Sequence, residues 1–285
     1  MKVKTAAKIN LALDVTGKLP NGYHSLESVF QTVGLYDEVE VELTNSGIKL
    51  SCEVPDEFAD ADPIPCDERN IAYKAARLFF EENGMDCSCR IHIKKGIPSQ
   101  AGMGGGSTDA AAVLYCLGRM TGKSLKTPEK LGADVPFFLT GGTAYVEGIG
   151  ERITPIADYS GRILVIAKGK EGVSTAEAYR NIDGLEEPLH PETQKLAEAI
   201  NTAPDTAYKY FGNLFEQAVR LPEVEDIRND MLKYRARRAV MTGSGSAVFG
   251  IFIDPAQAVR CADKLREKGY FATVCETVPE SFIII

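Results

Sequence analysis

The chain has 285 residues, and 32 Lys+Arg against 40 Asp+Glu give it a formal net charge of −8 at pH 7. Its 44% apolar residues are enough for a packed core, which excludes a disordered chain, and the length suits one large or two modest domains. An acidic chain without a long Lys/Arg run does not suit nonspecific binding to nucleic acid or to a membrane surface, so any bound phosphate must be held by backbone amides and a few placed cations.

The first predicted element is a strand over residues 3–15. Apolar side chains occupy its odd positions, whereas Lys8 and Asn10 occupy even ones, as on a strand with one buried face. We expect Lys8 and Asn10 to project together from the exposed face, where they either orient an anionic substrate or belong to an ordinary solvated surface. Asn21-Gly22 then indicates a turn.

Strands and a helix follow in the first half of the chain. Residues 38–43 alternate again, with an acidic face that we expect to be solvated, and residues 52–68 are a loop rich in Pro and Asp. Helical spacing over residues 70–82 predicts a helix that ends at Asn83-Gly84. Residues 87–93 alternate as a strand.

The second half has the same mixed character. The pattern predicts strands over residues 161–167, 247–253 and 271–275, and helices over residues 174–181, 192–200, 212–219 and 223–233. Residues 247–253 are almost uniformly apolar, as in a strand buried on both faces. Asp254-Pro255 predicts the capped start of a last helix, and Gly269 predicts its end. We expect two domains to join between residues 151 and 161.

A glycine-dense segment between the strand at 87–93 and an alanine-rich helix at about 107–120 carries the main functional signal. Four glycines in five positions allow backbone N–H groups to converge on an anion, and the positive end of the helix dipole adds to the field. The segment lacks the Walker A ending, and Ser107 stands where G-x-G-x-x-G needs its third glycine. We predict a polyphosphate site, with a flexible linker as the alternative. The predicted binding residues are Pro98, Ser99, Gln100, Ala101, Gly102, Met103, Gly104, Gly105, Gly106, Ser107 and Thr108.

Three smaller features could contribute to a site. Lys94 and Lys95 precede the glycines, and each either adds a cation or is solvated at a strand end. Asp134 is the one charge in residues 131–138, which makes it a candidate base or metal ligand, or simply an N-cap before a proline. Residues 241–246 form a second loop of small side chains, which either approaches a substrate phosphate or is an ordinary Gly-Ser turn.

Histidine and cysteine patterns indicate neither a metal site nor a disulfide framework. The three histidines lack metal-ligand spacing, and the seven cysteines are odd in number and scattered, so we expect buried free thiols, with Cys87 and Cys89 on one strand face. Polar residues interrupt the apolar stretch after the N-terminus, and no run approaches the roughly 18 apolar residues of a membrane span. We therefore expect a soluble, cytoplasmic protein.

Five short motifs occur in order along nearly the whole chain. They are A-K-I-N-L at residues 7–11, N-G-Y-H at 21–24, G-M-G-G-G-S at 102–107, L-G-A-D-V-P-F at 131–137 and G-S-G-S at 243–246. Together they resemble the GHMP kinase superfamily. The resemblance implies an α+β, two-lobed fold, with an N-terminal mixed α/β domain over residues 1–155, a C-terminal ferredoxin-like domain over residues 156–285, and the active site in the cleft between them.

The resemblance also implies a reaction and its residues. The motif combination is similar to the branch of the superfamily that uses ATP to phosphorylate the 2-hydroxyl of a cytidine diphosphate-linked methylerythritol in isoprenoid synthesis. In that branch Asp134 would be the catalytic base, and Lys8 would orient it and stabilise developing charge. The glycine loop would hold the ATP phosphates, with Asn70 and Lys95 as further ATP-site residues. The implied substrate-binding residues are Asn10, Tyr23, His24, Gly243, Ser244 and Gly245, with Tyr23 and His24 on the cytosine.

Some alternatives and departures accompany this resemblance. Mg²⁺ is expected with ATP, but the sequence assigns it no protein ligand beyond a guess at Ser107. Only residues 121–130 stand where the family usually has another helical segment, so either this member is shorter there or residues are missing. The alternative functions are another small-alcohol kinase of the homoserine or mevalonate type and a nucleotide-binding regulator without catalysis. The sequence leaves the oligomeric state open.

Overall fold

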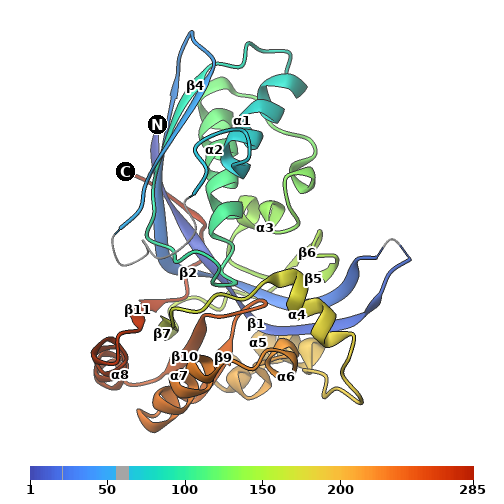
Figure 1. The fold of residues 1–285 in the computed structure, drawn as a ribbon, viewed down its shortest axis with the longest axis vertical. Coiled ribbons are helices and arrows are strands. Elements are labelled where there is room, and N and C mark those ends of the chain that lie inside the picture. Colours follow the sequence, from blue (N-terminus) through green and yellow to red (C-terminus); the bar gives the residue numbers. More distant parts are fainter. Residues whose placement is uncertain (21, 56–63) are drawn as a thin grey trace.

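The computed structural model describes residues 1–20, 22–55 and 64–285, and the predicted turn residue Asn21 lies outside them. A long antiparallel hairpin of β1 (Lys2–Lys18) and β2 (His24–Leu43) runs through the molecule (Figure 1). The described residues form two sheets, each with its own helices. The hairpin belongs to the larger sheet and its outer end extends past α4 (Thr175–Ile182).

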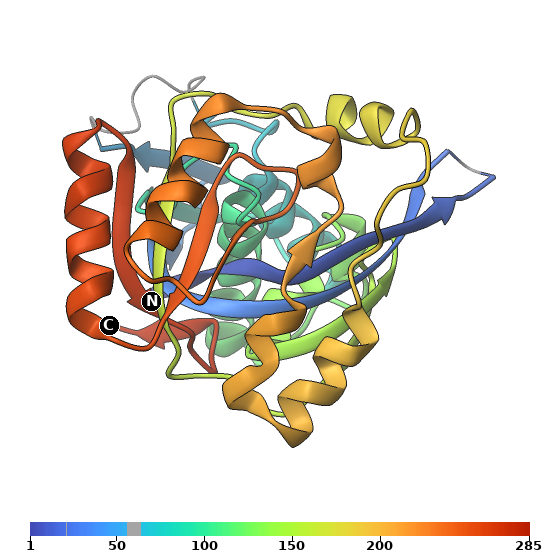
Figure 2. The same ribbon diagram turned by 90° about the horizontal axis from the view of Figure 1, so that it is seen from below.

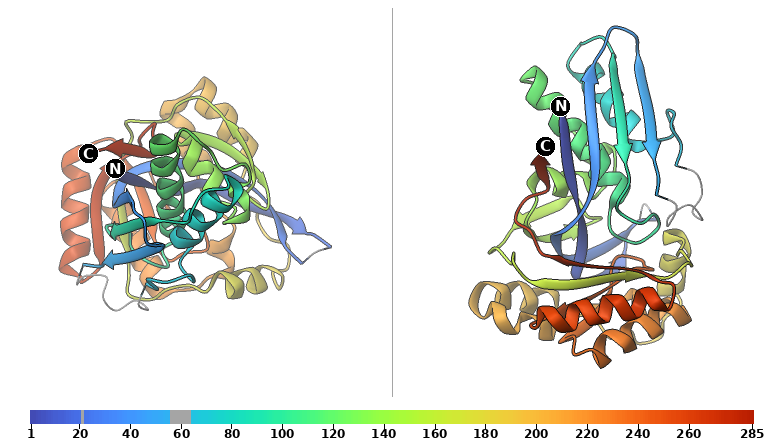
Figure 3. Two further views of the ribbon diagram at one scale, coloured as in Figure 1. Left: turned by 90° about the horizontal axis from the view of Figure 1, so that it is seen from above. Right: turned by 90° about the vertical axis from the view of Figure 1, so that its left-hand side faces the viewer.

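The larger sheet has the strand order β12-β1-β2-β4-β3. Its further members are β5, which pairs with β2, β6, which pairs with β5, and β8, which pairs with β1. The remaining strand bounds are β3 (Ile48–Glu53), β4 (Cys89–Lys94), β5 (Thr143–Gly148), β6 (Arg152–Pro155), β8 (Gly212–Asn213) and β12 (Phe282–Ile284). Because β12 pairs with β1, the two ends of the chain lie close together (Figure 3).

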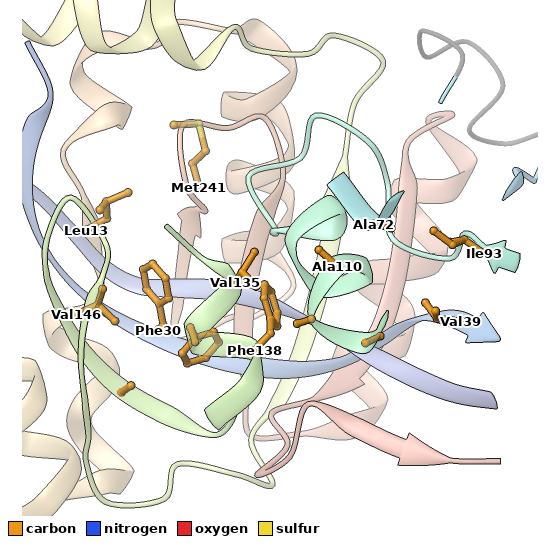
Figure 4. Close-up of a cluster of buried hydrophobic side chains, with 14 of the residues drawn as sticks. Leu13, Phe30, Val39, Ala72, Ile93, Ala110, Val135, Phe138, Val146 and Met241 are labelled. Carbon is orange, nitrogen blue, oxygen red and sulfur yellow. The ribbon is translucent and has the colours of Figure 1, made fainter. Parts of the chain in front are cut away.

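Three helices pack together beside this sheet: α1 (Ile71–Glu82), α2 (Gly105–Thr121) and α3 (Val135–Thr140). The buried face of α2 is rich in alanine, and these small side chains let the helix lie close to the sheet. Figure 4 shows part of the resulting core, in which Phe30 of β2 lies near Val135 and Phe138 of α3. A short 3₁₀ helix, Pro128–Lys130, precedes α3.

The second sheet has the antiparallel order β11-β7-β10-β9. If the four strands are numbered by their order along the chain, they lie across the sheet in the order 4-1-3-2, which is the ferredoxin-like arrangement that we predicted. Figure 2 shows helices α7 and α8 side by side across its outer face. The bounds are β7 (Ile163–Lys168), β9 (Arg238–Met241), β10 (Val248–Phe252), β11 (Phe271–Glu276), α7 (Pro222–Lys233) and α8 (Pro255–Glu267).

The remaining helices of the second half are short. They are α5 (Thr193–Thr202), α6 (Phe215–Ala218) and a 3₁₀ helix at Pro204–Tyr210, besides α4. The α+β class and the two lobes are thus as predicted. The domain boundary at 155/156 stays a prediction. Two short strands from the second half of the chain, β8 and β12, join the larger sheet. Among the described helices, none combines the length and the apolar composition that a membrane crossing requires.

Several predicted boundaries are wrong. Helix α2 begins at Gly105 rather than near Ser107, because Gly104 adopts a positive φ of 72° and serves as the N-cap. Residues 212–219 are not one helix, since Gly212–Asn213 pairs with β1 and only Phe215–Ala218 is helical. Cys52 lies inside β3, which ends at Glu53, so the predicted loop at 52–68 starts too early, and its residues 56–63 lie outside the described part of the chain. The pattern also missed the first half of β2 and the short strands β3, β5, β6, β9 and β12.

Candidate active site

The glycine segment between β4 and α2 lines a cavity of about 470 Å³. Gly102 and Gly104 both have positive φ. No side chain caps α2, so the first-turn N–H groups of this helix are left for a ligand to bind. A Cβ atom on Gly104 would lie 2.8 Å from the Phe138 ring. The wall of this first cavity includes Pro98, Ser99, Gln100, Ala101, Gly102, Met103, Gly104, Gly105, Gly106 and Ser107, and their role in binding phosphate stays a prediction.

Thr108, Asn70 and Lys95 differ from the rest of the predicted ATP site. The Thr108 hydroxyl donates to the Ala6 carbonyl oxygen, so it faces β1 rather than the cavity. Asn70 lines the cavity as the N-cap of α1, with its oxygen bound to the Ala72 N–H and its amide nitrogen donating to the Pro65 carbonyl oxygen. Lys95 also lines the cavity, but two carboxylates bind its ammonium group.

A second cavity, of about 320 Å³, adjoins the first, and Gly102, Gly104 and Ser107 line both. Its other lining residues come from seven separate stretches of the chain: Lys8, Asn10, Leu13, Leu26, Phe30, Ala133, Asp134, Ile149, Thr175, Tyr179, Phe215, Gly243 and Ser244. The two cavities therefore meet at the glycine loop. A group held by the loop on one side can face a molecule on the other side.

The two small-residue loops touch through their backbones. A Cβ atom on Gly102 would collide with the Thr242 carbonyl oxygen, and one on Gly243 would lie 2.7 Å from the Gly102 carbonyl oxygen. Thr175 of α4 and Ser244 share a hydrogen bond of 3.0 Å at the rim. Gly245 is not among the residues that line the second cavity, and it packs instead on Met241 and Val173.

Lys8 and Asp134 face each other inside the second cavity. The Lys8 Nζ atom lies 3.7 Å from Oδ2 of Asp134 and 4.6 Å from the centre of the Phe30 ring. Asp134 occupies the N-cap position of α3, but its side chain makes no capping bond, so its carboxylate remains directed at the site. Burial lowers the pKa of Lys8 below its ordinary value of 10.5, against the opposing effect of Asp134.

Asn10 connects Lys8 to the second loop. Its Oδ1 atom accepts from Lys8 Nζ at 2.8 Å and from the Gly243 N–H at 3.0 Å, and its Nδ2 group donates to Ser28. The expectation of an exposed strand face is therefore wrong: Lys8 is 4% exposed and Asn10 is 1% exposed, because the loop at Thr242–Gly243 covers this face.

His24 and Tyr23 lie at the start of β2 and just before it. The His24 ring stacks on Tyr179 of α4 with 4.6 Å between ring centres, and its Nε2 atom bonds to Asp183 at 2.7 Å. Tyr179 lines the second cavity, so His24 stands one ring behind the cavity wall. Tyr23 is 61% exposed and does not line either cavity. The roles of both in binding a base stay predictions.

Sequence reasoning missed Tyr179, Thr175 and Phe30 as site residues. Residues 174–181 were predicted as a helix, yet nothing in their local pattern marks Tyr179 as facing a cavity. Only the stack on His24, 155 positions away, could have done so. In the described part of the chain, no three His, Cys, Asp or Glu side chains are grouped to hold a metal ion. All seven cysteines are free, as expected, but only Cys89, Cys116 and Cys261 are buried. Cys66 is exposed and Cys52, Cys87 and Cys275 are half-buried, so the expectation of buried thiols is wrong for these four. Cys87 also precedes the strand that contains Cys89.

Comparisons with known proteins agree with this geometry. Residues 70–142 match the family model for the GHMP kinases N terminal domain, and residues 189–270 match the GHMP kinases C terminal model. A relative from Clostridium botulinum (strain Eklund 17B / Type B), 4-diphosphocytidyl-2-C-methyl-D-erythritol kinase, is 40% identical over 287 residues, covering 98% of this chain and 100% of the relative.

Solved structures give the same result. A crystal structure of 4-(cytidine 5'-diphospho)-2C-methyl-D-erythritol kinase superposes with a TM-score of 0.80 at 32% identity, covering 97% of this chain and 99% of the other. A homoserine kinase from Cytophaga hutchinsonii gives a TM-score of 0.75 at 17% identity, covering 100% of this chain and 97% of the other, which is a likeness of fold alone.

Proposed function

The chain belongs to the GHMP kinase family, which makes it an ATP-dependent kinase of a small-molecule acceptor, and we propose that its acceptor is 4-diphosphocytidyl-2-C-methyl-D-erythritol. The product would carry the transferred phosphoryl group on the 2-hydroxyl. The observation that carries the proposal is the pair of cavities that share the glycine loop, with Lys8 and Asp134 in the second one.

The donor side suits a polyphosphate. The loop amides and the uncapped start of α2 offer N–H donors and a positive field to the ATP phosphates, which a chain with a net charge of −8 must concentrate locally. We propose that Mg²⁺ accompanies the nucleotide. Mg²⁺ keeps several waters and takes its other ligands from one or two protein oxygens and the phosphates, so the Ser107 hydroxyl at the junction of the cavities fits as one ligand.

The acceptor side suits proton removal from a hydroxyl group. Phosphoryl transfer depends on alignment and charge neutralisation more than on covalent participation by the protein. Asp134 would accept the proton of the 2-hydroxyl as the oxygen attacks the phosphorus atom, and Lys8 would hold Asp134 ionised and offset the charge that develops. The 3.7 Å separation between Lys8 Nζ and Asp134 Oδ2 supports this division of roles.

The far end of the second cavity suits the remainder of the acceptor. Tyr179 presents an aromatic ring there, and we propose that Tyr179, His24 and Tyr23 together recognise the cytosine base. Gly243 and Ser244 would approach the diphosphate, with Gly245 allowing the turn of that loop. Asn10 would act through Lys8 and Gly243, which its amide oxygen already holds.

Two other functions remain as alternatives to this proposal. A homoserine or mevalonate type of acceptor has no base, and so would leave the aromatic cluster around Tyr179 without a partner. A regulator without catalysis would not need a buried lysine aimed at a carboxylate. A cytoplasmic location is also part of the proposal, and the seven free thiols support it.

A coupled assay for ADP tests the proposal directly. The chain is incubated with Mg²⁺-ATP and, separately, with 4-diphosphocytidyl-2-C-methyl-D-erythritol, homoserine or mevalonate. ADP is expected only with the cytidylylated acceptor. Turnover with homoserine or mevalonate alone would replace the acceptor in the proposal, and binding of ATP without any turnover would favour the regulator.

A further inference from the structure

Lys95 is buried between two carboxylates at the back of the glycine loop. Its ammonium group forms an ion pair with Asp109 at 2.7 Å and another with Asp37. The exposed fractions of these side chains are 6% for Lys95, 7% for Asp109 and 0% for Asp37. The group therefore joins three elements, because Asp37 belongs to β2, Lys95 follows β4, and Asp109 is the fifth residue of α2.

The start of the loop is fastened to β2 by the same residues. Oδ1 of Asp37 accepts from the Gly96 N–H at 2.7 Å and from the Ile97 N–H at 2.8 Å. Gly96 also runs so close to β2 that a Cβ atom there would collide with the Tyr36 carbonyl oxygen. Three successive residues, Lys95, Gly96 and Ile97, are thus tied to one short stretch of β2.

The end of the loop is fastened as well. Asp109 binds Lys95, and its neighbour Thr108 donates to the Ala6 carbonyl oxygen of β1. The residues between these two anchors, 98–107, form most of the donor cavity wall, which Lys95, Ile97, Asp109 and residues 64, 65 and 69–71 complete. Both ends of the cavity-lining segment are therefore held against the sheet, at a separation that the Lys95–Asp109 ion pair sets.

We propose that Asp37, Lys95 and Asp109 form a positioning triad that shapes the glycine loop for the donor nucleotide, and that Lys95 does not itself neutralise the phosphates. The inference rests on the proposed kinase function. Two carboxylates already surround one ammonium group, so a phosphate placed against Lys95 would meet negative charge as well. Oδ1 of Asp109 has no hydrogen-bond partner among the described residues, so this unpaired acceptor adds to the negative charge that a phosphate placed against Lys95 would meet.

The two roles of Lys95 predict opposite results for Asp109→Leu. A positioning triad loses the tie between the two ends of the loop, so the Kd for Mg²⁺-ATP measured by calorimetry rises by at least about tenfold. A lysine that contacts phosphate directly would instead be freed from one carboxylate, and ATP would bind equally well or more tightly. An unchanged or lower Kd in Asp109→Leu therefore overturns the proposal.

Two further variants separate positioning from general stability. Asp109→Asn keeps an oxygen of the same size and reach toward Lys95, so it should restore most of the ATP affinity that Asp109→Leu loses. In Asp109→Leu the KM for ATP should rise while the KM for the acceptor stays unchanged, and in Asp109→Asn both KM values should stay close to those of the unaltered protein. Lys94→Met is the matched control for Lys95→Met, because Lys94 is its exposed neighbour and forms an ion pair with Glu53 at 3.6 Å. Lys94→Met should leave the ATP Kd unchanged.

Hydrogen exchange on the unaltered chain decides the matter if the variants do not fold. The amide hydrogens of Gly96 and Ile97 should be protected in the ATP-free protein and should gain little from added ATP, because Asp37 already binds them. Protection that arises only with ATP would overturn the proposal. Calorimetry and hydrogen exchange need no acceptor, so a failure of the acceptor assignment would appear as ATP binding without ADP release and would leave this test standing.

Discussion

Two buried lysines stand on opposite sides of the glycine loop, and their surroundings differ. Lys95 lies between Asp37 and Asp109, and although burial opposes its charge, the two carboxylates raise its pKa above the ordinary value. Lys8 faces the single carboxylate of Asp134 across 3.7 Å, and burial lowers its pKa. The Lys95 ammonium group thus pairs with two carboxylates inside the protein, whereas the Lys8 ammonium group faces one carboxylate beside a cavity.

This difference assigns Lys95 a structural role and leaves Lys8 suited to a role in the reaction. A buried lysine already paired with two carboxylates has no electrostatic reason to respond to a substrate, and removing it leaves both carboxylates without their cation. A lysine that faces a single carboxylate, as Lys8 does, can stabilise negative charge that develops nearby. Burial alone therefore does not identify a reactive lysine, whereas the number and distance of its partners do.

The largest expected effect comes from Asp134→Asn. The amide keeps the shape of the side chain but cannot accept the proton, so kcat should fall by about 10³-fold. The Kd for ATP should not change, because Asp134 does not line the donor cavity. Steady-state kinetics and calorimetry on the same preparation check both statements. Activity that survives the substitution would remove Asp134 from its role as base.

Lys95→Met should mainly affect folding. Its loss leaves Asp37 and Asp109 as uncompensated buried carboxylates, which costs about 3–5 kcal/mol of unfolding free energy. Urea denaturation of Lys95→Met and of the control Lys94→Met measures the difference. Equal midpoints for the two variants would show that the triad contributes nothing to stability.

Lys8→Met should show the reverse pattern. Methionine fills a similar volume, and Asp134 is 29% exposed, so the carboxylate left behind is still solvated and the unfolding free energy should change by less than about 1 kcal/mol. The value of kcat should fall by about 10²-fold, because the developing charge loses its neighbouring cation. A variant that unfolds readily yet retains kcat would contradict the comparison of the two lysines.

The pH profile sharpens the same comparison. Because burial lowers the pKa of Lys8, its ammonium group loses a proton at a pH below 10.5, the ordinary pKa of a lysine. The kcat profile should therefore show an alkaline fall below pH 10.5, and in Lys8→Arg the fall should move upward, since a guanidinium group stays charged. An alkaline limb that is identical in both proteins would assign it to another group.

The smallest effect is expected at Asn70. Its side chain caps α1 and donates to Pro65, so Asn70→Ala should cost about 1 kcal/mol of unfolding free energy without changing the ATP Kd. Thermal denaturation and calorimetry measure the two quantities. A tenfold weaker ATP affinity would instead support the sequence prediction that Asn70 contacts the nucleotide.

The sequence predicted the local parts of this site better than the distant ones. Glycine density marked the phosphate loop, and a lone charge marked Asp134. The helix start was placed two residues late because glycines are poor helix formers, whereas Gly104 supplies the left-handed N-cap that lets Gly105 and Gly106 enter the first turn.

Contacts between distant segments explain the remaining errors. Alternation in β1 predicted an exposed face, but Thr242 and Gly243, more than 230 positions later, cover it. Lys94 and Lys95 could not be told apart by pattern, because the partners that bury Lys95 lie 58 positions before it and 14 after it. Tyr179 likewise lines the second cavity and stacks on His24, contacts with distant segments that its local pattern does not show.

The most direct test of the proposed reaction is the position of the transferred phosphate. The acceptor carbon that bears the 2-hydroxyl also bears the methyl group and has no hydrogen atom. A ³¹P spectrum of the reaction mixture should therefore show one new phosphate monoester resonance without coupling to a carbinol proton. A monoester resonance split by such a proton would place the phosphate on another hydroxyl, and no new monoester resonance would contradict the account.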